Sequence, residues 1–458
     1  MKKLLLIIST ISIALSLKAQ VFDTVNVITP GTLSTLLTVD QKATISNLTV
    51  TGTINSSDFS TMKSMVKLND LTLTNASVTD NKIPASAFYN DSILTTVHLP
   101  LSVTVIGSEA FYSCKSIKSI TISPIVTTIG YDAFGKFNGN IFVDPQNTSF
   151  SSVDGVLFNK NKTKLIRCPV SKQEEYDIPT SVDSIGVFAF KYCDKLTNVF
   201  IPPSVKSIDE EAFSYCTGLT SVMIPPSVTY LFFGAFMNCS GVTSLSINSS
   251  EDYLRNGNFS GCSKLSSVYI PKPYSLIGEG AFAWCDNLQS VSIPVSVNEL
   301  GPGAFSETDL KTIYCYNPIP PIPSTMISTN STVFYNVNIQ NCTLFVPAGK
   351  VQAYKSTDLW ADFNIKEMPA SVLKPNSKST YTVSSQSTSI KIQPSHTPWT
   401  AFVNVPWLQM SQVSSNSNDS VTIKVKANTD TVSRIGMIVL TSNFNLIGSN
   451  SSKLCFEF

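Results

Sequence analysis

The sequence has little charge and almost no histidine. Asp, Glu, Lys and Arg make up 14% of the 458 residues, and 32 basic residues stand against 31 acidic ones. A near-neutral surface does not attract nucleic acid or anionic lipid, so we expect neither as a partner. The two histidines, His98 and His396, lie far apart and have no acid or nucleophile near them at the spacing of a catalytic motif.

Motifs for catalysis and for cofactors are also absent. The sequence contains no zinc-protease helix signature, phosphate-binding loop, nucleophile elbow or dinucleotide fingerprint. The acidic run at residues 209–211 falls in an expected turn, where a solvated edge is a simpler interpretation than a pair of catalytic carboxylates. We therefore predict that the protein is not an enzyme and uses no cofactor or metal. The alternative is an active site that only the fold assembles.

Long apolar runs occur only at the N-terminus. Lys2 and Lys3 precede an apolar run over residues 4–17, which Lys18 follows. This run is shorter than the ~20 residues that a membrane-spanning helix needs, and the pattern is typical of a secretory signal peptide. We predict that residues 1–20 are such a signal, with a membrane anchor as the alternative. The mature protein would then be exported to the cell surface or beyond, without membrane insertion.

Phenylalanine, in contrast, is abundant and regularly spaced. It recurs every 23 residues, usually after an alanine, and a gap of 56 residues separates an upstream group from a downstream group. The positions are Phe88, Phe111 and Phe134, and then Phe190, Phe213, Phe236, Phe259, Phe282 and Phe305. A fixed period of this size indicates structural repeats that stack into a rod with one elongated core.

One repeat unit covers residues 212–228. Within it the pattern L-x-x-V-x-I alternates apolar and polar residues, which predicts a short β-strand with its apolar face turned inward. The proline that follows, such as Pro225, lacks a backbone donor and ends the strand. A turn, such as residues 182–186, then leads to the next Ala-Phe pair. One coil buries too little to fold alone, so we expect a continuous array with caps.

Cysteines accompany the phenylalanines. Six of them stand three residues after a repeat phenylalanine: Cys114, Cys193, Cys216, Cys239, Cys262 and Cys285. Equivalent positions in stacked coils should form an internal column. We predict buried, reduced cysteines that act as small hydrophobic residues. Disulfides between neighbouring coils and a metal site are the alternatives, although parallel side chains disfavour the first and a linear column cannot surround zinc.

The pattern F-x-x-C-x-x-L-x-x-V-x-I-P-x-S-V-x-x-I-G-x-x-A-F resembles the BspA-like leucine-rich repeats of secreted and surface proteins. The resemblance implies a repeat solenoid, with one short parallel β-strand in each coil and irregular or helical turns on the convex side. It also implies an N-terminal cap over residues 21–60, coils over 61–312 and a C-terminal cap over 313–368. Residues 153–169 resemble a variant coil, which would account for the long gap.

Residues 371–458 form a separate region rich in Ser, Thr and Val. Trp399, Trp407 and Arg434 are among the residues that make it similar to a BACON-type domain, a small Ig-like β-sandwich often inferred to bind carbohydrate or mucin. The sequence departs from that pattern at its end, so we expect an atypical or incomplete last strand. Trp399 and Trp407 are candidates for stacking on sugar rings; the alternative is that they pack in the sandwich core.

The outward positions of the repeat strands are a second candidate site. Most carry small hydroxyl side chains, but four carry larger ones: His98, Phe200, Met223 and Tyr269. We predict that these residues anchor a partner, and that Phe200 and Met223 of adjacent coils touch. The alternative is a solvated sheet on which scattered large side chains have no role.

These observations together predict an exported surface or secreted protein that uses its solenoid for adhesion or for recognition of an extracellular protein or glycan. One alternative is an accessory protein of polysaccharide utilisation that binds glycan or mucin through the C-terminal sandwich. Another is a structural spacer. The sequence indicates neither the ligand nor an oligomeric state.

Overall fold

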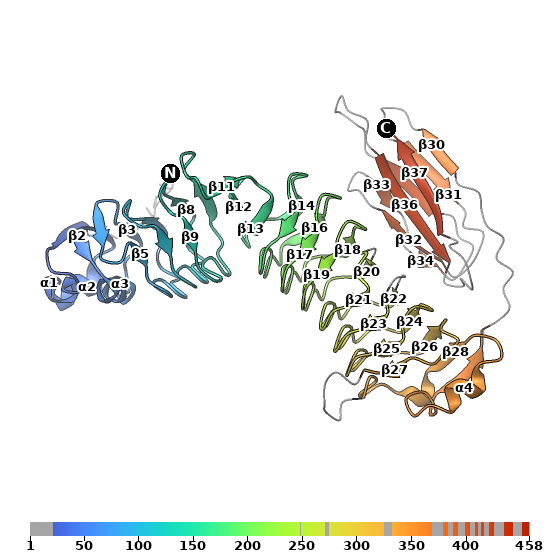
Figure 1. Ribbon diagram of the computed structural model, residues 1–458. Helices are drawn as coiled ribbons and strands as arrows, with labels where there is room; N and C mark the ends of the chain where they lie inside the picture. The colour runs from blue at the N-terminus through green and yellow to red at the C-terminus, as the bar shows by residue number, and fades with distance from the viewer. Residues whose placement is uncertain are drawn as a thin grey trace, which may run out of the picture.

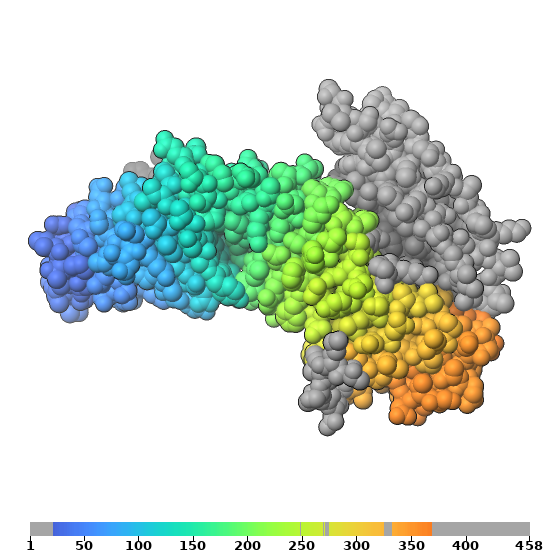
Figure 2. Space-filling view, viewed as in Figure 1, coloured from blue at the N-terminus to red at the C-terminus, as the bar shows by residue number. Residues whose placement is uncertain are grey.

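The computed structural model describes residues 22–247, 249–270, 274–324 and 332–368, apart from the side chain of Tyr269, and the backbone of eight later strands. Coils stack from one end to the other into a long, bent rod (Figures 1 and 2). This architecture confirms the predicted repeat solenoid. Among the described residues, no helix has the length and apolar character needed to cross a membrane.

The rod begins with a small mixed unit. It consists of β1 (Phe22–Val27), α1 (Leu33–Leu36), α2 (Val39–Thr44), β2 (Asn47–Ile54) and α3 (Ser56–Lys63). Strand β1 runs parallel to β2 and forms the end of its sheet. The buried carboxylate of Asp58 accepts hydrogen bonds from the backbone N–H groups of Gly31, Leu33 and Asn55, which fixes α3 to the chain before α1.

The L-x-x-V-x-I segments form a first ladder of short parallel strands, as the alternation predicted. Their apolar residues point inward, and neighbouring strands pair with a step of one repeat, as in Ser221↔Ser244. The strands are β3 (Asp70–Thr72), β6 (Thr96–His98), β8 (Ser119–Ile122), β10 (Asn140–Val143), β14 (Glu174–Asp177), β16 (Leu196–Phe200), β18 (Ser221–Ile224), β20 (Ser244–Ile247), β22 (Ser267–Tyr269), β24 (Ser290–Ile293), β26 (Thr312–Cys315), β28 (Thr343–Val346) and β29 (Asn364–Glu367).

A second ladder lies where the sequence predicted only a turn. Most of its strands have two residues, of which the second points inward and the first outward, as in Ser207-Ile208. They are β5 (Lys82–Ile83), β7 (Val105–Ile106), β9 (Thr128–Ile129), β13 (Lys164–Arg167), β15 (Ser184–Ile185), β17 (Ser207–Ile208), β19 (Tyr230–Leu231), β21 (Tyr253–Leu254), β23 (Leu276–Ile277), β25 (Glu299–Leu300) and β27 (Ile322–Pro323). A further strand, β4 (Ala76–Val78), pairs with β2.

Between the ladders, phenylalanine rings and thiols fill the core. From Phe190 to Phe334 each ring stacks on the next, with centroids 4.7–5.8 Å apart. Beside them, the Sγ atom of Cys216 donates to the carbonyl oxygen of Phe190, and other coils repeat this bond. The nine cysteines in the described part of the chain are all buried, as predicted, and none of them forms a disulfide there. Their reduced state stays a prediction.

The core is divided, whereas we expected one continuous core. The division falls at the variant coil, where β11 (Phe150–Val153) pairs antiparallel with β12 (Val156–Asn159). In β12, Leu157 packs into the core of the N-terminal half, while Val156 and Phe158 pack into that of the C-terminal half. Strand β12 is therefore buried on both faces and separates two stacks of coils (Figure 1).

Aromatic side chains close the C-terminal end of the array. After η1 (Ile339–Asn341), helix α4 (Val351–Lys355) connects β28 to β29. The rings of Trp360 and Phe363 contact Phe334 edge-on, at centroid distances of 5.4 and 5.1 Å, and end the stack. The indole N–H of Trp360 donates to the carbonyl oxygen of Pro321, so its polar atom is paired although the ring is buried.

The C-terminal region contains two groups of strands. One sheet has the order β30 (Ser379–Thr382), β37 (Ser451–Glu457), β36 (Ile435–Ser442), β32 (Trp399–Val403), β34 (Ser414–Ser415); the other has the order β31 (Thr388–Ile392), β35 (Val421–Val425), β33 (Leu408–Met410). Strand β37 pairs with both β36 and β30. The side chains here lie outside the described residues, so the BACON-type resemblance stays a prediction.

Candidate binding face

The structure separates the residues predicted on the first ladder. His98 ends β6 in the N-terminal half and is exposed. Phe200 and Met223 are half-buried on β16 and β18, in the C-terminal half. A hydrogen bond from the N–H of Thr220 to the carbonyl oxygen of Thr197 holds these two strands side by side. Their neighbouring positions agree with the proposed pair, and direct contact between the two side chains stays a prediction.

The other predicted site residues lie partly or wholly outside the described residues. Tyr269 belongs to β22 and Trp399 to β32, but only their backbone is described. Trp407 is not among the described residues. The sequence-based sites on the tail therefore stay predictions.

A larger cluster of exposed aromatic side chains lies on the second ladder, outside the surface predicted from the sequence. Tyr230, Phe232 and Phe233 are 54%, 39% and 45% exposed. Tyr253 and Arg255 of the next coil are half-buried beside them. We call these five residues the aromatic face. Tyrosine and arginine are among the side chains most enriched at the energetic centres of protein interfaces, and phenylalanine is enriched in interfaces as a whole.

The local sequence explains why these rings point outward. In β19 the buried Leu231 faces the core, so Tyr230 faces solvent, and Phe232 lies 6.2 Å from the Tyr230 ring. Phe233 lies across Gly257, where a Cβ atom would come within 3.5 Å of the ring. Gly257 has φ of +64°, a conformation that favours glycine. Because glycine has no side chain, the space beside residue 257 is open to the Phe233 ring.

Arg255 joins the two coils of the aromatic face. Its guanidinium lies 5.4 Å from the ring centroid of Phe232 and 5.0 Å from that of Tyr253, within the range of cation–π attraction. Its Nε donates to Glu251 Oε1 over 2.8 Å, and Glu251 Oε2 accepts from the N–H of Leu231 over 2.9 Å. The guanidinium is thus held in place by a buried carboxylate.

The Glu251 carboxylate also replaces one backbone hydrogen bond of the second ladder. The second ladder is interrupted between β19 and β21, and Glu251 takes the backbone donor of Leu231 that would otherwise lack a partner. Asn258, which stands where most coils have alanine, accepts from the N–H of Ala235 over 3.2 Å. Burial raises the pKa of Glu251, while Leu231 N–H and Arg255 act in the opposite direction.

A groove of about 490 Å³ continues from the aromatic face along β21, β23 and β25. Besides two serines, two glycines and a proline, its walls carry an aromatic ring, a leucine side chain, two amides and two carboxylates. These are Tyr253, Leu276, Asn256, Asn298, Glu279 and Glu299. Its size lies within the range of about 300–1,000 Å³ that is usual for ligand sites.

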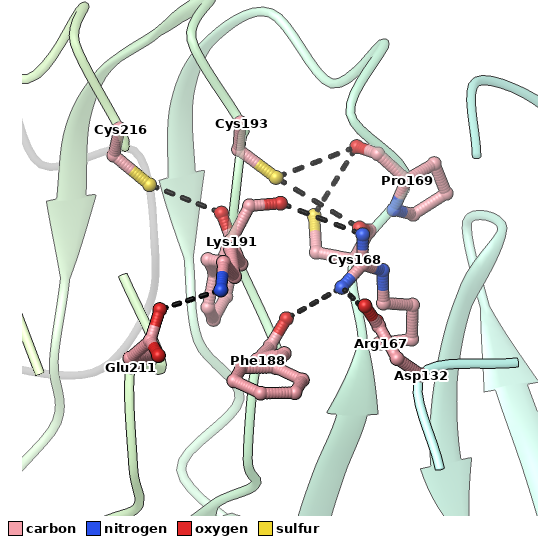
Figure 3. A network of polar contacts seen from close by, with 10 residues as sticks. Asp132, Arg167, Cys168, Pro169, Phe188, Lys191, Cys193, Glu211 and Cys216 are labelled. Atoms are coloured by element: carbon pink, nitrogen blue, oxygen red, sulfur yellow. Dashed lines mark hydrogen bonds and ion pairs between the residues drawn. The ribbon is translucent and has the colours of Figure 1, made fainter. Parts of the chain in front are cut away.

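A smaller cavity, of about 210 Å³, lies where the two halves of the rod meet. The buried Arg167 lines it and donates through Nη1 to the carbonyl oxygen of Phe188 over 2.6 Å, at 3.4 Å from Asp132 Oδ1 (Figure 3). Nearby, Lys191 pairs with Glu211. Burial raises the pKa of Asp132, and Arg167 opposes that rise. Because these charges pair within the rod, we interpret this network as a structural joint.

Within the described ranges, no three His, Cys, Asp or Glu side chains gather closely enough to hold a metal ion.

Comparison with known families identifies the repeats. The profile described as "BspA type Leucine rich repeat region" matches six copies between residues 40 and 357, which is more than half of the chain. The chain belongs to the BspA-type leucine-rich repeat family. This membership agrees with the resemblance seen in the F-x-x-C-x-x-L pattern. A search of the curated proteins found no match.

Several solved structures are similar to this BspA-type chain. A leucine-rich repeat protein from Eubacterium ventriosum is 20% identical, with a TM-score of 0.46, covering 73% of this chain and 81% of that one. A leucine rich cell surface protein from Faecalibacterium prausnitzii is 24% identical (TM-score 0.41; 64% and 78%). The pneumococcal vaccine antigen PcpA is 18% identical (TM-score 0.43; 73% and 82%). The family membership rests on the profile alone.

Proposed function

We propose that this BspA-type protein is a non-enzymatic binding protein that works at the cell surface or beyond and recognises its partner through the aromatic face. The observation that carries the proposal is the exposure of three adjacent rings, Tyr230, Phe232 and Phe233, next to Arg255. Exposed apolar patches bordered by polar groups often mark interaction sites.

The aromatic face is also fixed before a partner arrives. Glu251 holds the Arg255 guanidinium, and Arg255 in turn lies over the Phe232 ring, which belongs to the preceding coil. Glu251 and Arg255 belong to the coil after β19, so the rigid stack of coils sets their positions. Side chains that are already ordered lose less conformational entropy when a partner binds. This supports a recognition role over a chance exposure of apolar residues.

The test is binding of the full chain to intact neighbouring cells, followed by identification of the captured partner. We expect Tyr230→Ser/Phe232→Ser to weaken binding at least tenfold, because both rings would be anchors. The matched control is Tyr335→Ser, since Tyr335 is 55% exposed but lies in another coil. Thermal unfolding of each variant checks its folding. Wild-type binding by the folded double variant would contradict the proposal.

The same binding assay tests the first ladder and the tail as alternative binding sites. Phe200→Ser/Met223→Ser removes the two larger side chains of β16 and β18, and Trp399→Ala/Trp407→Ala tests sugar binding by the tail. If one of these two variants loses binding and the other does not, the binding site lies at the residues that the first one changes. If the wild-type chain binds no cell and no glycan, the spacer interpretation gains.

Export is the second part of the proposal and rests on residues 1–20. Cell fractionation followed by mass spectrometry of the exported chain tests it. We expect a protein outside the cytoplasm that lacks the apolar run over residues 4–17. An intact chain retained in the cytoplasm would contradict it.

A further inference from the structure

We propose that the groove beside the aromatic face binds a neutral oligosaccharide. This inference rests on the proposed function, because it names the chemistry of the partner at the same surface. Three observations carry it: the arrangement of the groove walls along the coils, the polar groups left unpaired there, and the sign of the charge.

The walls of the groove follow the coil repeat. Tyr253, Leu276 and Glu299 are register partners on β21, β23 and β25, so their outward side chains form one row across three coils. Neighbouring coils lie ~4.8 Å apart, as paired strands do. An extended chain of sugar rings laid along this row would meet an aromatic ring, an aliphatic side chain and a carboxylate in turn.

The row begins with a ring suited to the C–H face of a sugar. Arg255 lies 5.0 Å from the ring centroid of Tyr253 and its Nη1 donates to the tyrosine hydroxyl over 3.4 Å, so the ring is held by its neighbours. Ligand sites combine such apolar surfaces with a few placed polar groups. Leu276 extends the apolar surface into the next coil.

Polar side chains beside this row have hydrogen-bond donors and acceptors that no described residue uses. Asn256 Oδ1 accepts from the N–H of Glu279 over 3.0 Å, which orients the amide and leaves its Nδ2 donors unused among the described residues. Asn298 Oδ1 likewise accepts from Asn317 Nδ2 over 3.2 Å. The carboxylates of Glu279 and Glu299 make no hydrogen bond or ion pair with described residues. Hydroxyl groups both donate and accept, so they match this mixture of fixed donors and acceptors.

Charge then selects among carbohydrates. The two carboxylates are the only charged side chains that line the groove within the described residues. They repel sulfated, sialylated or uronic acid sugars, because like charges close together are unfavourable. A basic peptide would suit the carboxylates, but it would leave the Tyr253–Leu276 surface and the oriented amides without a match. We therefore assign the groove to an uncharged glycan.

The experiment measures binding of the full chain to an array of neutral oligosaccharides, sulfated and uronic acid oligosaccharides, and a lysine-rich peptide. Titration calorimetry then follows the best neutral ligand. We expect saturable binding of neutral glycans alone, weakened at least tenfold by Tyr253→Ala and by Asn256→Ala. Tyr335→Ala is the control for loss of an exposed ring, and thermal unfolding checks each variant. In parallel, periodate treatment of intact cells, which destroys sugar diols, should abolish cell binding.

The outcomes separate this inference from the proposed function. If no neutral glycan binds and periodate leaves cell binding unchanged, while Tyr230→Ser/Phe232→Ser still abolishes it, the glycan assignment fails and the aromatic face stands. If the peptide binds and Glu279→Gln/Glu299→Gln removes that binding, the groove takes a basic partner and the assignment is wrong. If neutral glycans bind equally to wild type and Tyr253→Ala, the site lies elsewhere.

Discussion

The thiol of Cys216 donates a hydrogen bond to the carbonyl oxygen of Phe190, one coil back, over 3.0 Å. Cys239 and Cys285 make the same bond to Phe213 and Phe259, over 3.1 and 3.2 Å. Each cysteine thus ties the turn that carries one phenylalanine to the next coil. The F-x-x-C spacing therefore serves inter-coil bonding as well as packing.

Replacing one of these cysteines should weaken the whole array. Cys216→Ala removes the bond to Phe190 and leaves a small gap in the core, and we expect a loss of ~1–3 kcal/mol in the free energy of unfolding. Urea denaturation of both proteins measures this difference. An unchanged midpoint would show that the thiol only fills space that its neighbours can close.

The cysteine thiols should also be unreactive toward alkylating reagents in the folded protein. Burial raises the pKa of the Cys239 thiol to about 12, so almost no reactive thiolate forms at neutral pH. We expect no alkylation by iodoacetamide in buffer and complete alkylation of Cys239 in denaturant, both measured by mass spectrometry. Fast labelling of this residue in the native state would mean that the coils open locally.

Two glycines of successive coils, Gly280 and Gly301, should differ in how much stability the protein loses when each is replaced by alanine. A Cβ atom on Gly301 would lie 2.4 Å from the backbone nitrogen of Glu279, whereas one on Gly280 would meet only the Ala283 Cβ, at 3.8 Å. Gly280 has φ of +58°, so Gly280→Ala should cost only the ~1–2 kcal/mol of a left-handed backbone.

Gly301→Ala should cost more stability, because the coil that carries Gly301 and the coil that carries Glu279 must move apart. We expect ~3 kcal/mol or more, at the upper end of overpacking effects. Thermal unfolding of the two variants under one buffer gives the comparison. Equal melting temperatures would indicate that the coils separate without strain.

Stability should depend on pH through Glu251. Burial raises its pKa, so the folded state binds a proton more tightly than the unfolded state. Relative to Glu251→Gln, the wild-type protein should therefore lose stability as pH rises from the ordinary glutamate value, about 4.3, through the higher folded value. Urea denaturation of both proteins at several pH values measures the difference. A relative gain by wild type with rising pH would mean that the ion pair with Arg255 outweighs burial.

The joint between the two halves depends on Arg167. Arg167→Met removes the donor to Phe188 and leaves Asp132 buried without its cationic partner, which typically costs ~3–5 kcal/mol. Asp132→Asn in the same chain should recover part of the loss. Hydrogen exchange should rise first around β11 to β13. Uniform exchange along the rod would contradict a local joint.

The sequence predicted the features that depend on the repeat itself. The 23-residue step gave the stacked phenylalanines, the first ladder and the cysteine column, because each follows from equivalent positions in identical coils. The second ladder was missed because two residues, such as Ser207 and Ile208, are too few to show alternation. The divided core was missed because β12 is apolar on both faces and resembles any buried strand.

The aromatic face was missed for a related reason. The predicted surface covered only the first ladder. On the second ladder, Ser184, Ser207 and Tyr230 form a register column, and Tyr253 follows Tyr230 at the same step in the sequence although β19 and β21 do not pair. The change from serine to tyrosine in that column was the available signal. The role of Glu251 could not be predicted, because it depends on a carboxylate that replaces backbone pairing at one place only.

Strand β12 contributes Leu157 to one core and Val156 and Phe158 to the other. Coils in such arrays interact mainly with their immediate neighbours. A partition of this kind allows either arm of the molecule to grow or shrink by whole coils during evolution while the opposite arm keeps its packing. The distance between the two tips, and with it the molecule's reach, can therefore change without redesign of the surface that binds.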